Sequence, residues 1–435
     1  MRGRRRVQIL AAAAVTLATA VAVAPAARAG AASVAPGAAA STAQVVSASA
    51  VPGAPAPPAL GVRGAILVAG STGQRLYGTN ADAELPIAST TKLMTALVTL
   101  ERAPMTETFP YPGTHFSPDA SQIGLVAGER MSVQDLLTAM LLPSADDAAQ
   151  DLAYNIGGGS VARFVAMMNA RAVQLGLTHT HYSTPIGLDT RGNYSSAADL
   201  VKLAGYLLAR YPLFAHIVAQ TNAVLHTGNQ VRDVVSLNGL VGKVPWIYGV
   251  KTGHTNDAGY VLVTIARKNG MTLLSAVLGT ASEAARDQNS LALLNWAYAN
   301  FRQTEPIVGG SVLARPTVAD QPGKRATVIA ASTLSEVVAS SSNMQVHLQV
   351  PHQLSGPLNR DTVVGRAIVL DDGRQLNTVP LVLARAVPGV SALTLAVRFI
   401  TEPITLLGLV LLLGGTATLI VRRRFHRRAR QPTAA

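Results

Sequence analysis

The sequence predicts an α/β domain with an antiparallel sheet flanked by helices, followed by a small all-β domain and a C-terminal transmembrane helix. Three observations predict this order. Strand-like and helix-like patterns alternate over residues 63–303, β-type alternation dominates residues 310–387, and residues 404–421 contain no charged side chain. A chain of 435 residues is long enough to form more than one core.

The N-terminus has the pattern of an export signal. Arginines at positions 2 and 4–6 precede the apolar run Val7–Ala24, and Ala27-Arg28-Ala29 matches an A-x-A cleavage site. We therefore expect a signal peptide over residues 1–29, with an uncleaved anchor as the alternative. Residues 30–62 are rich in Ala, Pro, Ser and Gly and carry no charge, which predicts a disordered linker.

The C-terminus carries a second membrane signal. Residues 404–421 are long enough to cross a bilayer, and six arginines lie within residues 422–435. The positive-inside rule then predicts a basic cytoplasmic tail, with residues 30–401 outside the cell membrane. A buried core helix is the alternative, but such helices rarely end in a cluster of arginines.

Charge and cysteine content exclude several classes of function. Eleven terminal arginines account for most of the formal net charge of +13 and leave a nearly neutral body, so we expect no nucleic-acid partner. The absence of cysteine excludes disulfides, thiol catalysis and Cys-ligated zinc.

Ser89-Thr90-Thr91-Lys92 is the sole S-x-x-K in the chain, and apolar residues at helical spacing follow it. On a helix, positions i and i+3 share a face, so the Lys92 amine can reach the Ser89 hydroxyl. A neutral lysine, its pKa lowered by burial or a neighbouring cation, can activate a serine as a nucleophile. Taken alone, four such residues are more often an ordinary first turn of a helix.

Lys251-Thr252-Gly253 is the sole K-T-G and lies on a predicted strand, residues 247–255. Strands over 259–266 and 271–278, joined by Asn269-Gly270, complete an antiparallel meander. An edge strand of this composition offers a charge and a hydroxyl to a carboxylate, and glycine allows a substrate backbone to approach closely. An ordinary surface lysine is the alternative.

Ser144-Ala145-Asp146 follows a helix whose start is predicted by Ser132-x-x-Asp135, the pattern of a capping box. Pro143 places Ser144 at a turn, where a side chain can be presented. Alone, this third motif predicts no function. It becomes informative because it lies between the other two motifs in the sequence.

Ser89, Ser144 and Lys251 occur at spacings of 55 and 107 residues, and this arrangement resembles the penicilloyl-serine transferases, with S-x-x-K, S-x-N and K-T-G. The chain is most similar to the D-alanyl-D-alanine carboxypeptidases of the low-molecular-mass penicillin-binding type, the S11 serine peptidases. The matching stretches are residues 86–97, 187–188 and 250–255. The resemblance implies a β-lactamase/transpeptidase-like catalytic domain, a following β-domain and a membrane anchor.

The resemblance also implies roles for individual residues. Ser89 would be the nucleophile, Lys92 its general base, and Ser144 a proton relay toward the leaving amine. The backbone N–H groups of Ser89 and His254 would form the oxyanion hole. The implied substrate-binding residues are Lys251, Thr252, Gly253, Asp146 and Arg286. For Arg286, a surface arginine at a helix start is an equal alternative. No metal or cofactor is implied.

Asp146 departs from the family pattern, which has Asn at this position. An amide can donate a hydrogen bond, whereas an ionised carboxylate can only accept one. At ~4 Å and an effective dielectric of about 20, the carboxylate would favour a charged Lys92 by roughly 4 kcal/mol. A working site therefore predicts that Asp146 is protonated, or that it points away while Asp147 or water adjusts.

The sequence thus predicts a membrane-anchored serine carboxypeptidase that removes terminal D-alanine from peptidoglycan stem peptides ending in D-Ala-D-Ala and is inhibited by β-lactams. A catalytically degenerate relative that binds cell wall remains open. So do a β-lactamase, although no E-x-x-L-N segment is present, and a D,D-endopeptidase on the same fold. A zinc peptidase is disfavoured because the chain has no H-E-x-x-H.

Overall fold

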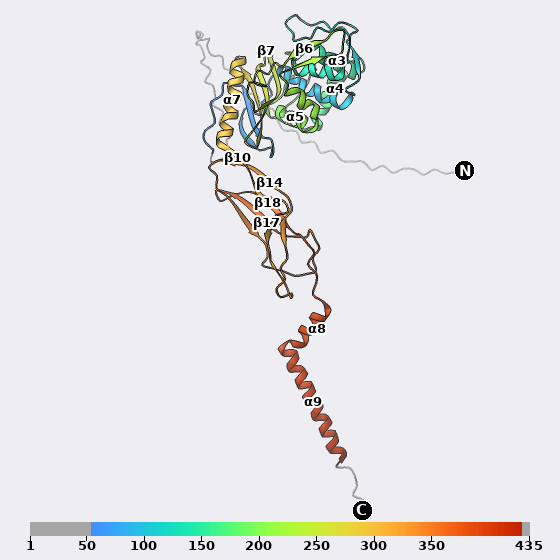
Figure 1. Ribbon diagram of the computed structural model, residues 1–435, viewed down its shortest axis with the longest axis vertical. Helices are drawn as coiled ribbons and strands as arrows, with labels where there is room; N and C mark the ends of the chain where they lie inside the picture. Colours follow the sequence, from blue (N-terminus) through green and yellow to red (C-terminus); the bar gives the residue numbers. More distant parts are fainter. Residues whose placement is uncertain (1–53, 429–435) are drawn as a thin grey trace, which may run out of the picture. The chain divides into compact units, whose positions relative to one another are not determined.

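The computed structural model describes residues 54–428 (Figure 1). The predicted signal peptide, linker residues 30–53 and tail residues 429–435 lie outside the described part. Residues 54–62 form no helix or strand. They contact α7 (Glu283–Asn300), where Asn289 Oδ1 accepts a hydrogen bond from the Gly61 N–H and Trp296 Nε1 donates to the Pro55 carbonyl.

A five-stranded antiparallel sheet organises the first part of the chain, in the order β2-β1-β9-β8-β7. Its strands are β1 (Gly64–Ala69), β2 (Arg75–Thr79), β7 (Ile247–Thr255), β8 (Gly259–Lys268) and β9 (Met271–Thr280). The predicted meander is confirmed, with Asn269 and Gly270 both at positive φ in its turn. Strand β7 lies at the edge of the sheet, so no strand of the sheet pairs with its outer side.

Helices cover both faces of this sheet, as Figure 1 shows for α7 on one side and α3, α4 and α5 on the other. The larger apolar core lies on the face of α1 to α6, and α7 closes a second core against the opposite face. The helices on the larger core are α1 (Lys92–Arg102), α2 (Val133–Leu141), α3 (Asp146–Ile156), α4 (Val161–Gln174), α5 (Ala197–Arg210) and α6 (Pro212–Val218). This sheet flanked by helices is the predicted α/β class.

Two short hairpins accompany these helices. They are β3 (Thr108–Pro110) with β4 (Arg130–Ser132), and β5 (Asn222–Leu225) with β6 (Arg232–Val235). The predicted capping box at the start of α2 is half formed. Ser132 Oγ accepts from the Asp135 N–H at 3.1 Å, whereas the Asp135 carboxylate binds the backbone and hydroxyl of Thr227.

The chain from Phe301 onward is β-structured up to residue 383. This part contains a two-stranded sheet of β10 (Phe301–Ile307) and β14 (Leu334–Ala339) and a five-stranded sheet in the order β11-β13-β18-β17-β15. Its strands are β11 (Val312–Ala314), β13 (Val328–Ala330), β15 (Met344–Gln349), β17 (Val363–Asp371) and β18 (Arg374–Leu383), and β12 (Thr317–Val318) pairs with β16 (Gln353–Leu354). The β-structure expected from the alternation in this part of the chain is confirmed, and β17 and β18 pair across the Asp372-Gly373 turn. The domain limits 63–303 and 310–387 remain predictions.

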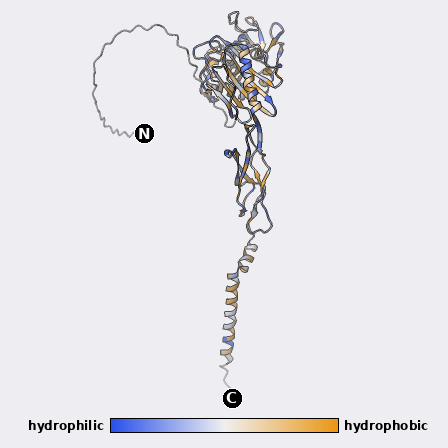
Figure 2. Ribbon diagram, turned by 90° about the vertical axis from the view of Figure 1, so that its left-hand side faces the viewer, coloured by the Kyte–Doolittle hydropathy of each residue, from blue (hydrophilic) through white to orange (hydrophobic). Residues whose placement is uncertain are grey.

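Two helices end the described chain, α8 (Ala392–Thr401) and α9 (Pro403–Arg428). Within the described residues, Pro403–His426 is one helix of sufficient length and apolarity to cross a membrane, and its 18-residue apolar window has a mean hydropathy of 2.4 and is not buried. Figure 2 shows apolar residues along most of α9, with hydrophilic residues toward its C-terminal end.

Candidate active site

Ser89 and Lys92 meet at the start of α1. A single 3-10 turn, η1 (Ala88–Thr91), precedes the helix, and Ala88 adopts a positive φ of 47°. Lys92 is fully buried, and its Nζ lies 2.8 Å from Ser89 Oγ. The i, i+3 contact expected from the sequence is therefore formed, and it places an amine within proton-transfer distance of the candidate nucleophile.

Asp146 does not point away from this pair. Its Oδ1 lies 2.6 Å from Lys92 Nζ, and the Ile186 carbonyl accepts a third hydrogen bond from the same nitrogen at 2.8 Å. Asp147 does not replace Asp146 beside Lys92. Its carboxylate accepts hydrogen bonds from backbone N–H groups of residues 123–125 at 3.0–3.2 Å. The expectation that Asp146 turns away is thus wrong, because a buried ammonium with three donors recruits the nearest acceptors.

Burial nevertheless decides the direction of the Lys92 pKa. Removal from water lowers the pKa of the Lys92 ammonium, and this outweighs the opposing effect of the Asp146 carboxylate, so the pKa falls below its ordinary value. The Asp146 carboxylate thus makes the lowering of the Lys92 pKa smaller but does not reverse it. At a given pH, a larger fraction of Lys92 is therefore neutral than of an exposed lysine.

Ser144 is held between α2 and α3 by Lys251. The serine has a φ of 65°, in the left-handed region, and its Oγ accepts from Lys251 Nζ at 2.9 Å. Because this donation occupies an acceptor site on Ser144, its own O–H remains able to donate elsewhere.

Lys251 is buried on β7, with an exposed fraction of 1%, and its pKa is lowered well below the ordinary value. Burial is the main cause, and repulsion from Lys92 adds to it. Arg286 contributes in the same direction, while Asp146 opposes it. Asp146 therefore contacts Lys92 directly and acts on Lys251 only through its charge, while the charge of Lys92 disfavours the protonated form of Lys251.

Glycines allow the elements of the site to meet. A Cβ on Gly253 would lie 3.0 Å from both the Ser89 nitrogen and the Ala88 Cβ, so β7 touches the η1 turn that carries Ser89. Gly187 has a φ of 92°, and a Cβ there would lie 2.0 Å from the Ala88 carbonyl oxygen. Any side chain at either position would separate the nucleophile from its surroundings.

The remaining predicted residues lie on β7 or near it. Thr252 is buried, and the exposed His254 ring stacks on Tyr260 across the strand pair at 3.9 Å. Arg286 is 3% exposed on α7, where it pairs with Glu283 at 3.0 Å and Asp287 at 2.8 Å. The positive charge of Arg286 helps to lower the pKa of Lys251, so it acts electrostatically on the site even though its guanidinium is paired with these two carboxylates.

Sequence reasoning missed the segment of residues 183–194. Besides the Ile186 carbonyl, it contributes Asn193, which is buried and donates through Nδ2 to Thr91 Oγ1 at 3.1 Å. Thr95 Oγ1 also bonds the Pro185 carbonyl at 2.6 Å. The clue in the sequence was Gly187-Leu188, a matching stretch to which no role was given.

A serine hydroxyl beside a buried lysine on this α/β fold fits a serine-type hydrolase. The profile of the D-alanyl-D-alanine carboxypeptidase family, peptidase S11, matches residues 52–282, and the chain belongs to this family of penicillin-binding proteins. D-alanyl-D-alanine carboxypeptidase DacF of Bacillus subtilis is 28% identical over 329 residues, covering 73% of this chain and 84% of the relative. DacA of Haemophilus influenzae is 29% identical over 341 residues, covering 75% and 85%.

Solved structures agree with this assignment. Penicillin-binding protein 5 of Haemophilus influenzae has a TM-score of 0.65 at 26% identity, covering 77% of this chain and 99% of that one. The Streptomyces K15 DD-transpeptidase has a TM-score of 0.53 at 30% identity and covers 56% of this chain and 99% of its own. The match to penicillin-binding protein 5 therefore covers more of this chain than the match to the K15 enzyme does.

Proposed function

We propose that this protein is a membrane-anchored serine D-Ala-D-Ala carboxypeptidase that trims peptidoglycan stem peptides through an acyl-enzyme. The observation that carries the proposal is the 2.8 Å contact between Lys92 Nζ and Ser89 Oγ, in a site that lowers the lysine pKa. The names of the relatives supply the substrate class, a peptide ending in D-Ala-D-Ala.

Acylation begins when neutral Lys92 takes the Ser89 proton. Ser89 Oγ then attacks the carbonyl carbon of the penultimate D-Ala, and the N–H groups of Ser89 and His254 stabilise the negative charge on its oxygen. Collapse breaks the peptide bond. The departing amine of the terminal D-Ala receives, through Ser144, the proton that Lys92 took from Ser89, so that Lys92 is neutral again. Lys251 holds Ser144 in place.

The positive charges act on the leaving residue. Lys251 and Thr252 bind the terminal carboxylate of the peptide, and Arg286 adds to the positive field. Deacylation follows when water loses a proton to Lys92 and attacks the ester. The carbonyl–oxygen bond of the ester breaks, and Ser89 recovers its hydroxyl as the shortened peptide leaves.

The apolar helix α9 and the arginines after it support the proposed location. The apolar α9 would anchor the protein, with the catalytic part outside the cytoplasm and the basic tail inside. The substrate then lies on the same side of the membrane as Ser89. β-Lactams would act as inhibitors by acylating the same serine.

A second candidate function is cell-wall binding without turnover. The 2.6 Å contact between Asp146 and Lys92 favours it, because a carboxylate stabilises the ammonium that cannot act as a base. The intact Ser89–Lys92 contact and the lowered lysine pKa values oppose it.

Mass spectrometry of the full chain in detergent tests the proposal. Incubation with benzylpenicillin should add one penicilloyl group at Ser89, and incubation with a D-Ala-D-Ala peptide should release D-alanine. Ser89→Ala should abolish both while leaving the melting temperature nearly unchanged, and the exposed Ser355→Ala should retain both. Labelling of folded Ser89→Ala would refute the nucleophile, and folded wild type without labelling at any pH would favour the second candidate.

A further inference from the structure

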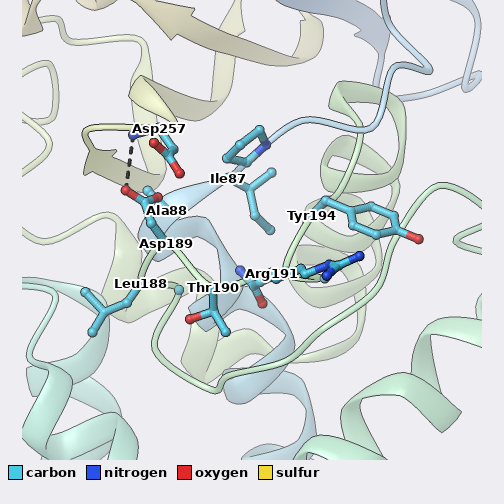
Figure 3. Close-up of a pocket in the computed structure, with 12 residues that line it drawn as sticks. Ile87, Ala88, Leu188, Asp189, Thr190, Arg191, Tyr194 and Asp257 are labelled. Atoms are coloured by element: carbon cyan, nitrogen blue, oxygen red, sulfur yellow. Dashed lines mark hydrogen bonds between the residues drawn. The ribbon is translucent and has the colours of Figure 1, made fainter.

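A pocket of about 390 Å³ lies beside the candidate nucleophile and has no role in the mechanism above. Figure 3 shows its lining, which comes from residues 86–88 at the start of η1, from residues 187–194 and from Asp257 after β7. Because Ala88 is the chain neighbour of Ser89, the pocket lies close enough to the serine for one molecule to occupy both.

The pocket carries charges of both signs. Asp189 and Asp257 lie on one side and Arg191 on the other, as Figure 3 shows. All three side chains are exposed, and within residues 54–428 none of them forms an ion pair with another protein group. Unpaired charges of opposite sign on facing walls fit a ligand that carries both charges itself.

The walls are fixed to the active site. Asn193 bonds Thr91 in η1, Lys92 bonds the Ile186 carbonyl, and Asp189 Oδ2 accepts from the Asp257 N–H at 3.1 Å. The last contact joins the segment of residues 187–194 to the β7–β8 turn. The pocket therefore keeps its position relative to Ser89, as selective binding requires.

The direction of the substrate follows from the proposed function, on which this inference rests. The terminal carboxylate lies at Lys251 and Thr252, and the scissile carbonyl lies at Ser89 beside Gly253. A peptide extended along the free edge of β7 advances about 3.3 Å per residue, so the residue before D-Ala-D-Ala is carried toward the end of β7 and Asp257.

We propose that this pocket binds the side chain of the stem-peptide residue preceding D-Ala-D-Ala, and that it selects a side chain ending in an amino-acid head group. Such a head group, as in 2,6-diaminopimelate, carries an ammonium and a carboxylate on one carbon. The ammonium binds Asp189 and Asp257, and the carboxylate binds the fork of Arg191. A lysine side chain supplies the ammonium alone and leaves Arg191 unpaired.

The test compares three synthetic peptides that differ at this residue. They contain diaminopimelate with a free side-chain carboxylate, the same residue with that carboxylate amidated, or lysine. We measure kcat/KM for D-alanine release by the full chain in detergent. The free carboxylate should be preferred about fivefold over each of the other two, because both lack the charge that faces Arg191.

Two substitutions in the pocket, each with an exposed control, test which residues select among the three peptides. Arg191→Gln should bring the ratio of kcat/KM for the free and amidated peptides close to one, whereas Arg210→Gln, an exposed arginine at the end of α5, should keep the wild-type ratio. Asp189→Asn retains an oxygen that can accept the Asp257 N–H, so it tests charge without removing that contact. It should lower kcat/KM for all three peptides, whereas the exposed Asp233→Asn should not.

Benzylpenicillin, which lacks this side chain, separates the outcomes. Normal acylation at Ser89 with a wild-type ratio near one, or with a ratio unchanged in Arg191→Gln, overturns the pocket assignment and leaves the proposed function intact. Equal loss of acylation and of peptide turnover in Asp189→Asn would make that residue a support for the loop and refute its role in binding. Absence of both reactions in the wild type overturns the proposed function and this inference together.

Discussion

At the residue scale, the site works through an opposition between burial and charge. Lys92 and Lys251 are both enclosed, and burial lowers the pKa of each, whereas the nearby Asp146 carboxylate raises both. The position usually occupied by an amide in this family thus holds a charge. That charge acts on the group that must be neutral for acylation.

Asp146→Asn should remove the effect that raises the Lys92 pKa. Because that pKa then falls further, a larger fraction of Lys92 is neutral at any given pH. The rise of acylation with pH should move to lower pH, and below its midpoint the rate should increase by about three- to tenfold. The measurement is the rate of acylation by benzylpenicillin from pH 5 to pH 10.

The exposed Asp233→Asn serves as the matched control and should follow the wild-type profile. A slower Asp146→Asn protein with an unshifted profile would show that the carboxylate is an adapted part of this site. It would also show that its contact with Lys92 assists the reaction.

At the scale of the element, α3 carries more than one function. Asp146 faces Lys92, Asp147 holds the backbone of residues 123–125, and Asp151 is fully buried one turn further on. Asn155 donates to Asp151 Oδ1 at 2.6 Å, while Oδ2 has no partner. Burial, and then the charge of Asp147, raise the pKa of Asp151 to about 7.

Asp151 should therefore make stability depend on pH. As pH rises from the ordinary value of 3.8 to about 7, the unfolded chain loses this proton while the folded protein keeps it, so the free energy of unfolding falls. Asp151→Asn cannot ionise. Relative to wild type, it should gain about 3 kcal/mol between pH 5 and pH 8.

Urea unfolding of both proteins at pH 5, 6.5 and 8 measures this difference, with Asp233→Asn as the exposed control. A stability difference between Asp151→Asn and wild type that does not change with pH would mean that Asp151 is already ionised in the folded protein at pH 5.

At the scale of the whole molecule, the candidate active site and the candidate membrane span occupy different stretches of the chain. All candidate site residues precede Phe301, whereas the apolar helix begins at Pro403. In α8, which precedes that helix, several apolar side chains are exposed, including Leu393 at 75% and Phe399 at 69%.

Truncation after Glu402 should remove the span without changing the rate of acylation by benzylpenicillin. The full chain should stay in the membrane pellet after carbonate extraction, and the truncated chain should be released because one short amphipathic helix binds lipid reversibly. A second truncation after Ser391 removes α8 as well and should abolish residual binding to vesicles. Carbonate-resistant pelleting of the shorter proteins would place the anchor elsewhere.

Local patterns were sufficient to predict the elements that carry the site. The meander of β7 to β9 is encoded by alternation and by Asn269-Gly270, whose positive φ values suit those two residues. The Ser89–Lys92 contact likewise follows from i, i+3 spacing on a helix. Both depend on interactions between residues close in sequence, and motif order supplied the family.

The contacts between distant segments were decided by the tertiary structure. Asp146 lies 54 positions from Lys92 and Asn193 lies 102 from Thr91, and no local pattern states whether such side chains meet. The direction of the Lys92 pKa also required the fold, because a sequence shows a charge pair but not how completely it is removed from water. By itself, the sequence determined the class of protein and predicted its candidate reacting groups, whereas packing set the direction of the lysine pKa shifts and formed the pocket beside them, because both depend on which distant segments exclude solvent together.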